Sequence, residues 1–451
     1  MRPSLRRLPA LDHDGLHLAR PASAKRRRVI VFLRLETGVT LLSDKDGLRS
    51  GGSGVGSQEI INQSVEGIEY ELATAIHGLT NEQRKKIGLV RGHGELDSLA
   101  LWGFTHALLE RYDVLPVTLS SIRKQPSFDA LIIAKPTKSF SEVDKYNLDR
   151  YILSGGKVVF LLDQYDASMD SASREDYYAF PFDLRLSDQL FRYGVRINED
   201  LVQDLVSAKY PVVIGENGNK PELMQMEWPF FPLITHYAKH PVTRNLDAAW
   251  TRFVSSIDTV KAVGIKKTPL FFSSPDSRRV GTPVKIGIND LRRGLKPENY
   301  QEGEIPLAYL LEGKFTSLYK NRFAPPGADT TGRGLPAKPS KVVVIADGDI
   351  ARNDINPRNG QPQPLGMDPF TGYTFANETL LLNLVTYLIE ENGVINARNK
   401  EVKVRPLDKK KIKAEQHYWQ AINLGTPLLA LFIFGFTRSY FRKRKYAQFT
   451  S

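Results

Sequence analysis

The feature that most constrains this 451-residue chain is an uncharged segment near its carboxyl end. Residues 418–437 contain no Asp, Glu, Lys or Arg. Twenty helical residues rise about 30 Å, which matches the hydrocarbon thickness of a bilayer. Tyr418 and Trp419 precede the apolar run, and Tyr440 and Phe441 follow it, as is typical of residues at a membrane interface. We therefore expect a transmembrane helix at 418–437, the alternative being a buried helix of a soluble core.

Basic residues lie on both sides of this segment. Four lysines occupy positions between 409 and 413, and five basic residues lie between 438 and 445. Positive charge close to the end of a span favours the cytoplasmic side. Because the denser cluster follows the span, we expect a cytoplasmic tail at 438–451 and the rest of the chain on the other side of the membrane.

Charge and cysteine content exclude several classes of protein. The net charge of +12 comes from the two ends: residues 1–50 carry +6 and residues 401–451 carry +8, which leaves −2 for the middle. Proteins that bind nucleic acid present a basic face on the folded body, so we expect no nucleic-acid partner. The absence of cysteine excludes disulfides, thiolate-bound metals and cysteine nucleophiles.

The middle of the chain alternates between strand and helix patterns. The run at 128–134 is almost continuously apolar, as in parallel strands buried on both faces. Short connections between these elements predict a doubly wound α/β fold with a mostly parallel sheet. The proline-rich interval 201–335 predicts an irregular β-rich insertion. The expected strands are 86–90, 113–119, 128–134, 157–163 and 341–347, and the expected helices are 64–77, 98–112, 141–153 and 378–392.

These patterns divide the chain into seven parts. The first is basic and ends in a glycine-serine run, which is typical of a disordered segment and a flexible linker. The expected parts are a disordered segment at 1–57, the first part of the α/β domain at 58–200, the insertion at 201–335, completion of the α/β domain at 336–400, a basic linker at 401–417, the span at 418–437 and the tail at 438–451.

A glycine-rich loop follows the first strand of the pattern. It contains Gly92, His93, Gly94 and Glu95, and it lies where open α/β sheets bind ligands. The Gly-x-Gly-x-x-Gly and Walker patterns are both absent. We favour a tight structural loop, with a ligand-binding or partner-binding loop as the alternative.

Aspartates end two of the expected strands. Asp163 closes one strand, and Asp347 and Asp349 close another, with Asp354 five residues further on. Carboxylates can hold Mg²⁺ or Ca²⁺, but the spacing fails the EF-hand pattern. We favour turn and capping roles for all four aspartates. For Asp163 the alternative is a ligand-binding role, and for Asp347, Asp349 and Asp354 the alternative is a metal site. Since neither Gly-x-Ser-x-Gly nor His-Glu-x-x-His occurs, the sequence predicts no catalytic residue and no cofactor.

Six segments carry a family resemblance: 62–71, 84–96 with Arg-Gly-His-Gly-Glu, 129–136, 240–246, 346–349 with Ala-Asp-Gly-Asp, and 377–388. Together they resemble the gliding-motility-associated ABC-transporter auxiliary proteins of the GldG type. The resemblance covers about residues 58–446. It implies a glutamine-amidotransferase-like or flavodoxin-like layout, a periplasmic body, a bacterial inner-membrane location, and an ABC permease and ATPase as partners. Family members begin with a membrane helix, so the arginine-rich start here implies an atypical or truncated amino terminus.

Together these observations predict a non-enzymatic, membrane-anchored auxiliary subunit of an ABC transporter that contacts membrane lipid and the transporter subunits. Two alternatives remain open. One is a tethered metal-dependent hydrolase that uses Asp347, Asp349 and Asp354. The other is a scaffold that binds a glycan or a peptide.

Overall fold

The computed structural model describes residues 84–122, 128–169, 177–217, 220–281, 283–287, 295–331, 333–390 and 409–446. The chain divides into two compact units, one containing the α/β body and the other containing the carboxyl-terminal helix, and each is described by itself. The helix expected at 64–77 and the segment 1–57 lie outside the described residues.

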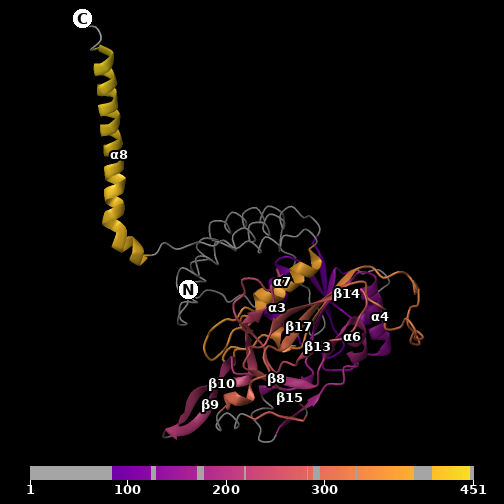
Figure 1. The fold of residues 1–451 in the computed structure, drawn as a ribbon. Coiled ribbons are helices and arrows are strands. Elements are labelled where there is room, and N and C mark those ends of the chain that lie inside the picture. The colour runs from indigo at the N-terminus through magenta and orange to yellow at the C-terminus, as the bar shows by residue number, and fades with distance from the viewer. Residues whose placement is uncertain are drawn as a thin grey trace, which may run out of the picture. The chain divides into compact units, whose positions relative to one another are not determined.

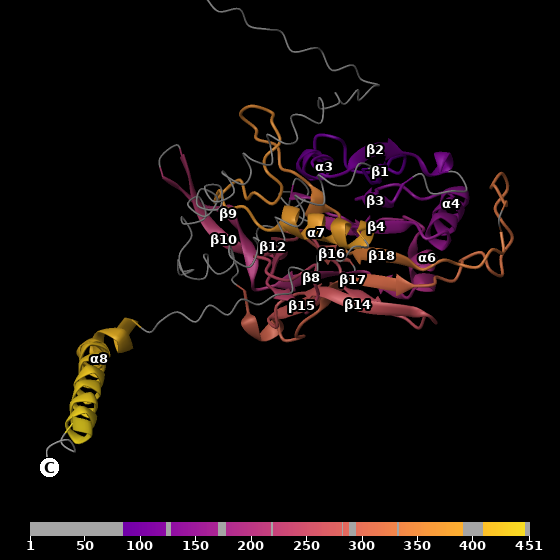
Figure 2. The same cartoon turned by 90° about the horizontal axis from the view of Figure 1, so that it is seen from above.

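The body is built on an eight-stranded sheet with the order β11-β14-β17-β18-β4-β3-β1-β2 (Figure 2). The neighbours from β18 to β2 are all parallel, and β17, β14 and β11 continue the sheet in antiparallel pairs. The prediction of a mixed α/β fold with a mostly parallel sheet is confirmed. The strands are β1 (Lys86–Val90), β2 (Asp113–Val117), β3 (Ala130–Ala134), β4 (Lys157–Leu161), β11 (His236–Tyr237), β14 (Ile265–Phe272), β17 (Pro306–Gly313) and β18 (Ser340–Ile345).

Helices cover both faces of this sheet. Helices α3 (Trp102–Leu109) and α7 (Asn377–Ile389) lie on one side, while α4 (Glu142–Leu153) and α6 (Ser187–Tyr193) lie on the other (Figure 1). All five residues of β3 are buried, as its apolar sequence predicts. The predicted start of α4 is also confirmed, because the Ser141 hydroxyl accepts a hydrogen bond from the Asp144 amide.

The interval 201–335 contributes directly to the main sheet. Strands β11, β14 and β17 all come from it, and β18 pairs with β17 on one side and β4 on the other. Residues Leu307 to Leu311 of β17 are buried. We expected this interval to form an irregular insertion, but its apolar strands complete the sheet because β18 would otherwise expose a hydrophobic edge.

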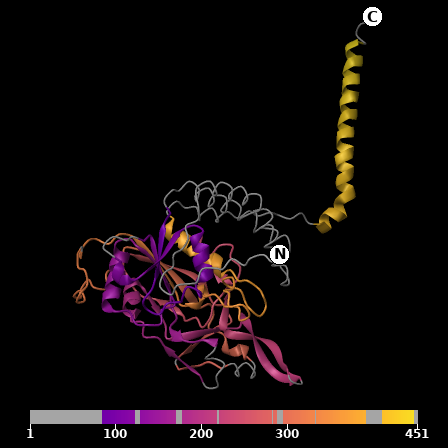
Figure 3. The same ribbon diagram turned by 180° about the vertical axis from the view of Figure 1, so that it is seen from behind.

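The rest of the interval forms a second, aromatic core. Strands β9 (Ser207–Asn217) and β10 (Lys220–Ile234) make a long hairpin that projects from the body (Figures 1 and 3). Trp228, Phe231 and Phe253 pack at its base. The remaining elements are β5 (Tyr165–Asp166), β6 (Tyr178–Pro181), β7 (Val195–Ile197), β8 (Asp200–Asp204), β12 (Ala249–Trp250), β13 (Ile257–Thr259), β15 (Ser277–Gly281), β16 (Val284–Lys285), and the short 3₁₀ helices η1 (Leu119–Ser121), η3 (Pro297–Asn299) and η4 (Asp349–Ala351).

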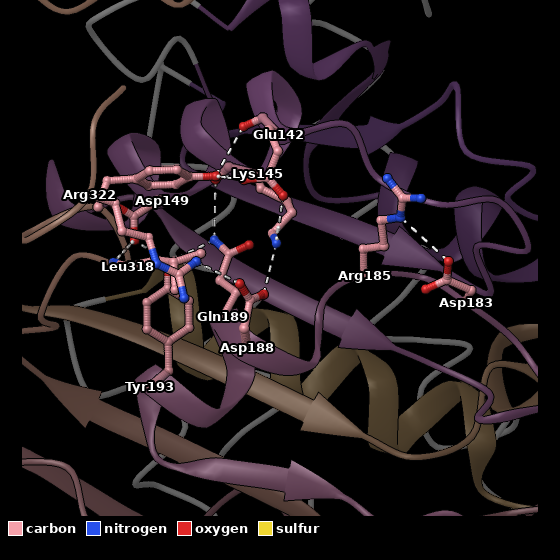
Figure 4. A network of polar contacts seen from close by, with 11 residues as sticks. Glu142, Lys145, Asp149, Asp183, Arg185, Asp188, Gln189, Tyr193, Leu318 and Arg322 are labelled. Carbon is pink, nitrogen blue, oxygen red and sulfur yellow. Dashed lines mark hydrogen bonds and ion pairs between the residues drawn. The ribbon is translucent and has the colours of Figure 1, made fainter. Parts of the chain in front are cut away.

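The connection between β17 and β18 is a long loop whose first part is anchored to α4 and α6. Asp149 of α4 is fully buried, and its carboxylate accepts hydrogen bonds from the Ser317 hydroxyl (2.6 Å), the Tyr193 hydroxyl (2.8 Å) and the Leu318 amide (3.1 Å) (Figure 4). Burial raises the pKa of Asp149. One buried carboxylate therefore holds the loop against two helices.

Replacing Asp149 by alanine should lower the free energy of unfolding by about 2–4 kcal/mol, because three buried or partly buried donors lose their acceptor. Urea denaturation measures this change, and limited proteolysis should show faster cleavage within the loop. The exposed Asp183 supplies the control, and Asp183→Ala should change stability by less than about 0.5 kcal/mol. Equal stability of the two variants would contradict the anchoring role of Asp149.

The second unit contains one long helix, α8 (Lys409–Tyr446). Its segment Tyr418–Lys445 has the length and composition of a membrane span, and none of this segment is buried. Leu428 and Phe436, which a soluble core helix would bury, are 57% and 76% exposed. The helix therefore fits a single membrane span.

Candidate functional site

The loop after β1 is held by a buried histidine. His93 stacks on Phe140 with ring centroids 3.8 Å apart, and its two ring nitrogens lie 3.2 Å from Glu95 Oε1 and 3.3 Å from Asp144 Oδ2. The amides of Thr137 and Lys138 both donate to the His93 carbonyl. Although burial opposes protonation, the hydrogen bonds with the two carboxylates raise the pKa of His93.

The second glycine of this loop is required by a close approach. Gly94 has φ +72°, and a Cβ atom there would lie 2.2 Å from Thr137 Oγ1. A side chain would clash with the turn that follows β3. These contacts support a structural role for His93, Gly94 and Glu95. The alternative role of Gly92, His93, Gly94 and Glu95 as a ligand-binding or partner-binding loop stays a prediction.

Two buried aspartates and a largely buried lysine meet beyond the carboxyl ends of β3, β4 and β18. The Lys135 ammonium lies 2.8 Å from Asp163 Oδ2 and 2.6 Å from Asp349 Oδ2. The side chains of Asp163 and Asp349 are only 2% and 3% exposed. Carboxyl ends of parallel strands lie at one edge of a sheet, so residues distant in sequence are brought together here. We call Lys135, Asp163 and Asp349 the edge triad.

Asp347 lies beside the edge triad but is satisfied by the backbone. Its two oxygens accept hydrogen bonds from the amides of Arg252 (3.0 Å), Asp349 (2.8 Å) and Ile350 (3.2 Å). Asp354 lies further along and pairs with the Arg252 guanidinium, with Nη1 3.0 Å from Oδ1. Arg252 therefore connects these two aspartates, and its guanidinium also stacks on the Trp250 ring at 3.9 Å.

The environment shifts the pKa values of the carboxylates in opposite directions. Burial is the main cause that raises the pKa of Asp163 to about 6, against the attraction of Lys135. Burial also raises the pKa of Asp347. The pKa of Asp349 is lowered, because Lys135 and two arginines outweigh its burial. The pKa of Lys135 is raised, since its two carboxylates outweigh the effect of burial.

The raised pKa of Asp163 predicts a specific pH dependence. A carboxyl whose pKa is higher in the folded state binds a proton more readily there, so its contribution to stability falls as pH rises from about 4 to about 6. The stability of the wild type relative to Asp163→Asn should therefore fall by about 2–3 kcal/mol across this interval. Urea denaturation of both proteins at several pH values measures it. A difference that stays constant or grows with pH would contradict this assignment.

Sequence reasoning singled out Asp163 and Asp349 but missed Lys135. Lys135 has φ +51° and directly precedes Pro136, a position that disfavours helical conformations of either hand. Across from it, a Cβ atom on Gly348 would lie 2.6 Å from Lys135 Cβ. A lysine at the end of an entirely apolar strand, followed by proline, was the signal available in the sequence. Strained backbone of this kind is concentrated at functional sites.

The chain supplies the cation of this site itself. The described residues contain no group of three or more metal-type ligands, and the Lys135 ammonium lies between the two carboxylates that a metal would need. The residues present therefore do not fit a divalent ion. We expect the melting temperature to be unchanged by EDTA and by added Mg²⁺, as thermal denaturation can measure. Stabilisation by Mg²⁺ that disappears in Asp349→Ala would contradict this expectation.

Comparison with known proteins places this architecture in a family. A family model described as an ABC-type uncharacterized transport system matches residues 84–384, from the start of β1 into α7. The chain belongs to this ABC transport auxiliary family. The match covers well over half of the chain and includes every residue of the edge triad.

One curated relative and two solved structures that match this chain share low sequence identity with it. An uncharacterized protein of Borreliella burgdorferi is 24% identical over 365 residues, which cover 78% of this chain and 64% of the relative. The chain thus spans less than two thirds of that protein. Among solved structures, the mmIFT52 N-terminal domain has a TM-score of 0.39 at 12% identity and covers 68% of this chain and 98% of its own length. A thua-like protein from Parabacteroides merdae has a TM-score of 0.29 at 11% identity, over 72% and 94% of the two chains.

Proposed function

We propose that this protein is a non-enzymatic, membrane-anchored auxiliary subunit of an ABC transporter, with an extracytoplasmic α/β body. The observation that carries the proposal is α8, whose span segment is apolar and entirely unburied. A helix that is apolar on all sides needs lipid or other membrane helices around it. Membership of an ABC transport auxiliary family makes a permease the natural neighbour of this helix.

The chemistry of the sheet edge supports a non-enzymatic role. In the edge triad, both carboxylates face the Lys135 ammonium, and Asp347 is occupied by three backbone amides. Catalytic carboxylates need an oxygen that can reach a substrate. These groups are instead engaged with one another, which is typical of a structural network.

Finer parts of the proposal rest on further observations. The strand order β2-β1-β3-β4-β18 supports a flavodoxin-like layout, in which the first strand lies between the second and the third. The basic cluster after the span supports a cytoplasmic tail and a periplasmic body in a bacterial inner membrane. The association with gliding motility rests on the resemblance of segments such as 84–96 alone.

Co-purification tests the proposal. The tagged full chain, extracted from its native membrane in a mild detergent, should retain a permease and an ATPase, identified by mass spectrometry. Proteolysis of intact spheroplasts should cleave the body while a cytoplasmic control protein survives. Recovery of the chain in the soluble fraction would overturn the membrane anchorage. Protection of the body from protease until the cells are lysed would overturn the orientation.

A further inference from the structure

A cavity lies between α6 and the anchored start of the β17–β18 loop. Its volume is about 540 Å³, within the range of small-molecule sites. Asp188, Phe191 and Arg192 line it from α6, and Asn321 and Arg322 line it from the loop. The cavity is separate from the edge triad, since it contains none of the three residues.

One of the positively charged side chains around this cavity has no carboxylate partner among the described residues. Asp188 accepts from the Lys145 ammonium at 2.8 Å and from the Arg322 guanidinium at 2.9 Å (Figure 4). Lys145 also bonds Glu142, so these four side chains balance one another. Within the described parts of the chain, Arg192 has no ion pair and is exposed. The cavity therefore favours a ligand with negative charge.

The arginines offer hydrogen-bond donors in addition to charge. Only one nitrogen of the Arg322 guanidinium donates to Asp188, which leaves further N–H groups on the same side chain. Arginine binds carboxylate and phosphate through parallel hydrogen bonds that an amine cannot supply. Asn321, also in the lining, can add an amide donor.

The cavity lining also contains the aromatic ring of Phe191. The Phe191 side chain in the lining is 53% exposed, and Phe323, next to Arg322 in sequence, is 94% exposed. Leu318, which also belongs to the lining, is buried. Exposed aromatic rings beside free donors are typical of sites that bind a ligand with both apolar and polar parts.

The loop side of the cavity is fixed before any ligand arrives. Asp149 holds Ser317 and Leu318, and the Tyr319 hydroxyl donates to the Glu142 carboxylate at 2.9 Å. Long loops without secondary structure that are nevertheless ordered usually have a function. A preformed wall also lowers the entropy lost when a ligand binds.

We propose that this cavity binds a small ligand that carries a carboxylate or phosphate group on an apolar body. The anionic group bonds Arg192 and Arg322, and the apolar body lies on Phe191. The inference does not depend on the proposed transporter function, because it rests on the cavity's own side chains.

Phenyl phosphate, phenylacetate and inorganic phosphate serve as probes, titrated by calorimetry into the full chain in a non-ionic detergent. Phenyl phosphate or phenylacetate should bind, and Arg192→Ala should weaken that binding about tenfold, as expected for a charge-assisted hydrogen bond. Arg192 holds no ion pair in the described residues, so this variant should keep the wild-type melting temperature. Phe191→Ala should weaken phenyl phosphate about fivefold and leave inorganic phosphate unaffected.

Arg185→Ala is the matched control. Arg185 lies in the segment before α6 and pairs with Asp183, away from the Asp188 network (Figure 4). Its substitution should change binding by less than about twofold. Binding of neither aromatic anion up to about 10 mM, or equal losses in Arg192→Ala and Arg185→Ala, would overturn the proposal. If inorganic phosphate binds as tightly as phenyl phosphate, the apolar part of the ligand class is wrong.

Discussion

Replacing Lys135 by methionine is expected to lower the free energy of unfolding by about 3–5 kcal/mol, as found when one partner of a buried ion pair is removed. Methionine keeps most of the side-chain volume but removes the ammonium. Asp163 and Asp349, both almost fully buried, would then lose the ammonium that lies between them, and of the two only Asp349 would keep an ion pair within the described residues, with Arg352 at 3.4 Å. Urea denaturation at neutral pH measures the loss.

Two further variants separate the charge from the packing. Lys138→Met changes an exposed lysine three residues away and should alter stability by less than about 0.5 kcal/mol. Adding Asp163→Asn to Lys135→Met should restore part of the lost stability, because one uncompensated buried charge is removed. If Lys135→Met costs less than about 1 kcal/mol, the edge triad does not stabilise the sheet as the geometry indicates.

Two arginines at the centre of α8 should abolish membrane anchorage. Leu428 and Phe432 lie four residues apart and therefore on one face of the helix. Each arginine at the centre of a span costs about 2.5–3.5 kcal/mol on the insertion scale. The double variant Leu428→Arg, Phe432→Arg should therefore leave most of the chain extractable by carbonate, as membrane fractionation and blotting can measure.

The matched variant carries the same two charges at the ends of the span. Gln420→Arg combined with Ser439→Arg places both arginines where their side chains can reach the lipid headgroups. This variant should remain in the membrane fraction. Equal membrane retention of the central and terminal variants would show that α8 is held by protein rather than by lipid.

The regular elements of the body could be predicted because their signals are local. The run Lys86–Val90 was predicted with the bounds that the structure has, and the helix predicted at 141–153 begins in the structure at its cap, Ser141. The apolar segment of α8 needs no tertiary contact to be recognised. Asp163 and Asp349 could be singled out as strand-end carboxylates, because parallel strands bring their carboxyl ends to one edge.

The sequence alone determined helices α3, α4 and α7, the parallel strands of the body and the apolar character of α8, since periodicity and apolar length report burial directly. Only the tertiary structure decided which charges meet. Lys135 is separated from Asp349 by more than two hundred residues, and no local pattern indicates that its ammonium lies between two aspartates. The same holds for β17, which pairs with β18, and for β14, which pairs with β17. It also holds for the cavity beside α6, whose loop wall is fixed by the buried Asp149. Non-local pairing and buried ion geometry depend on the folded backbone, so these features could not be read from the chain.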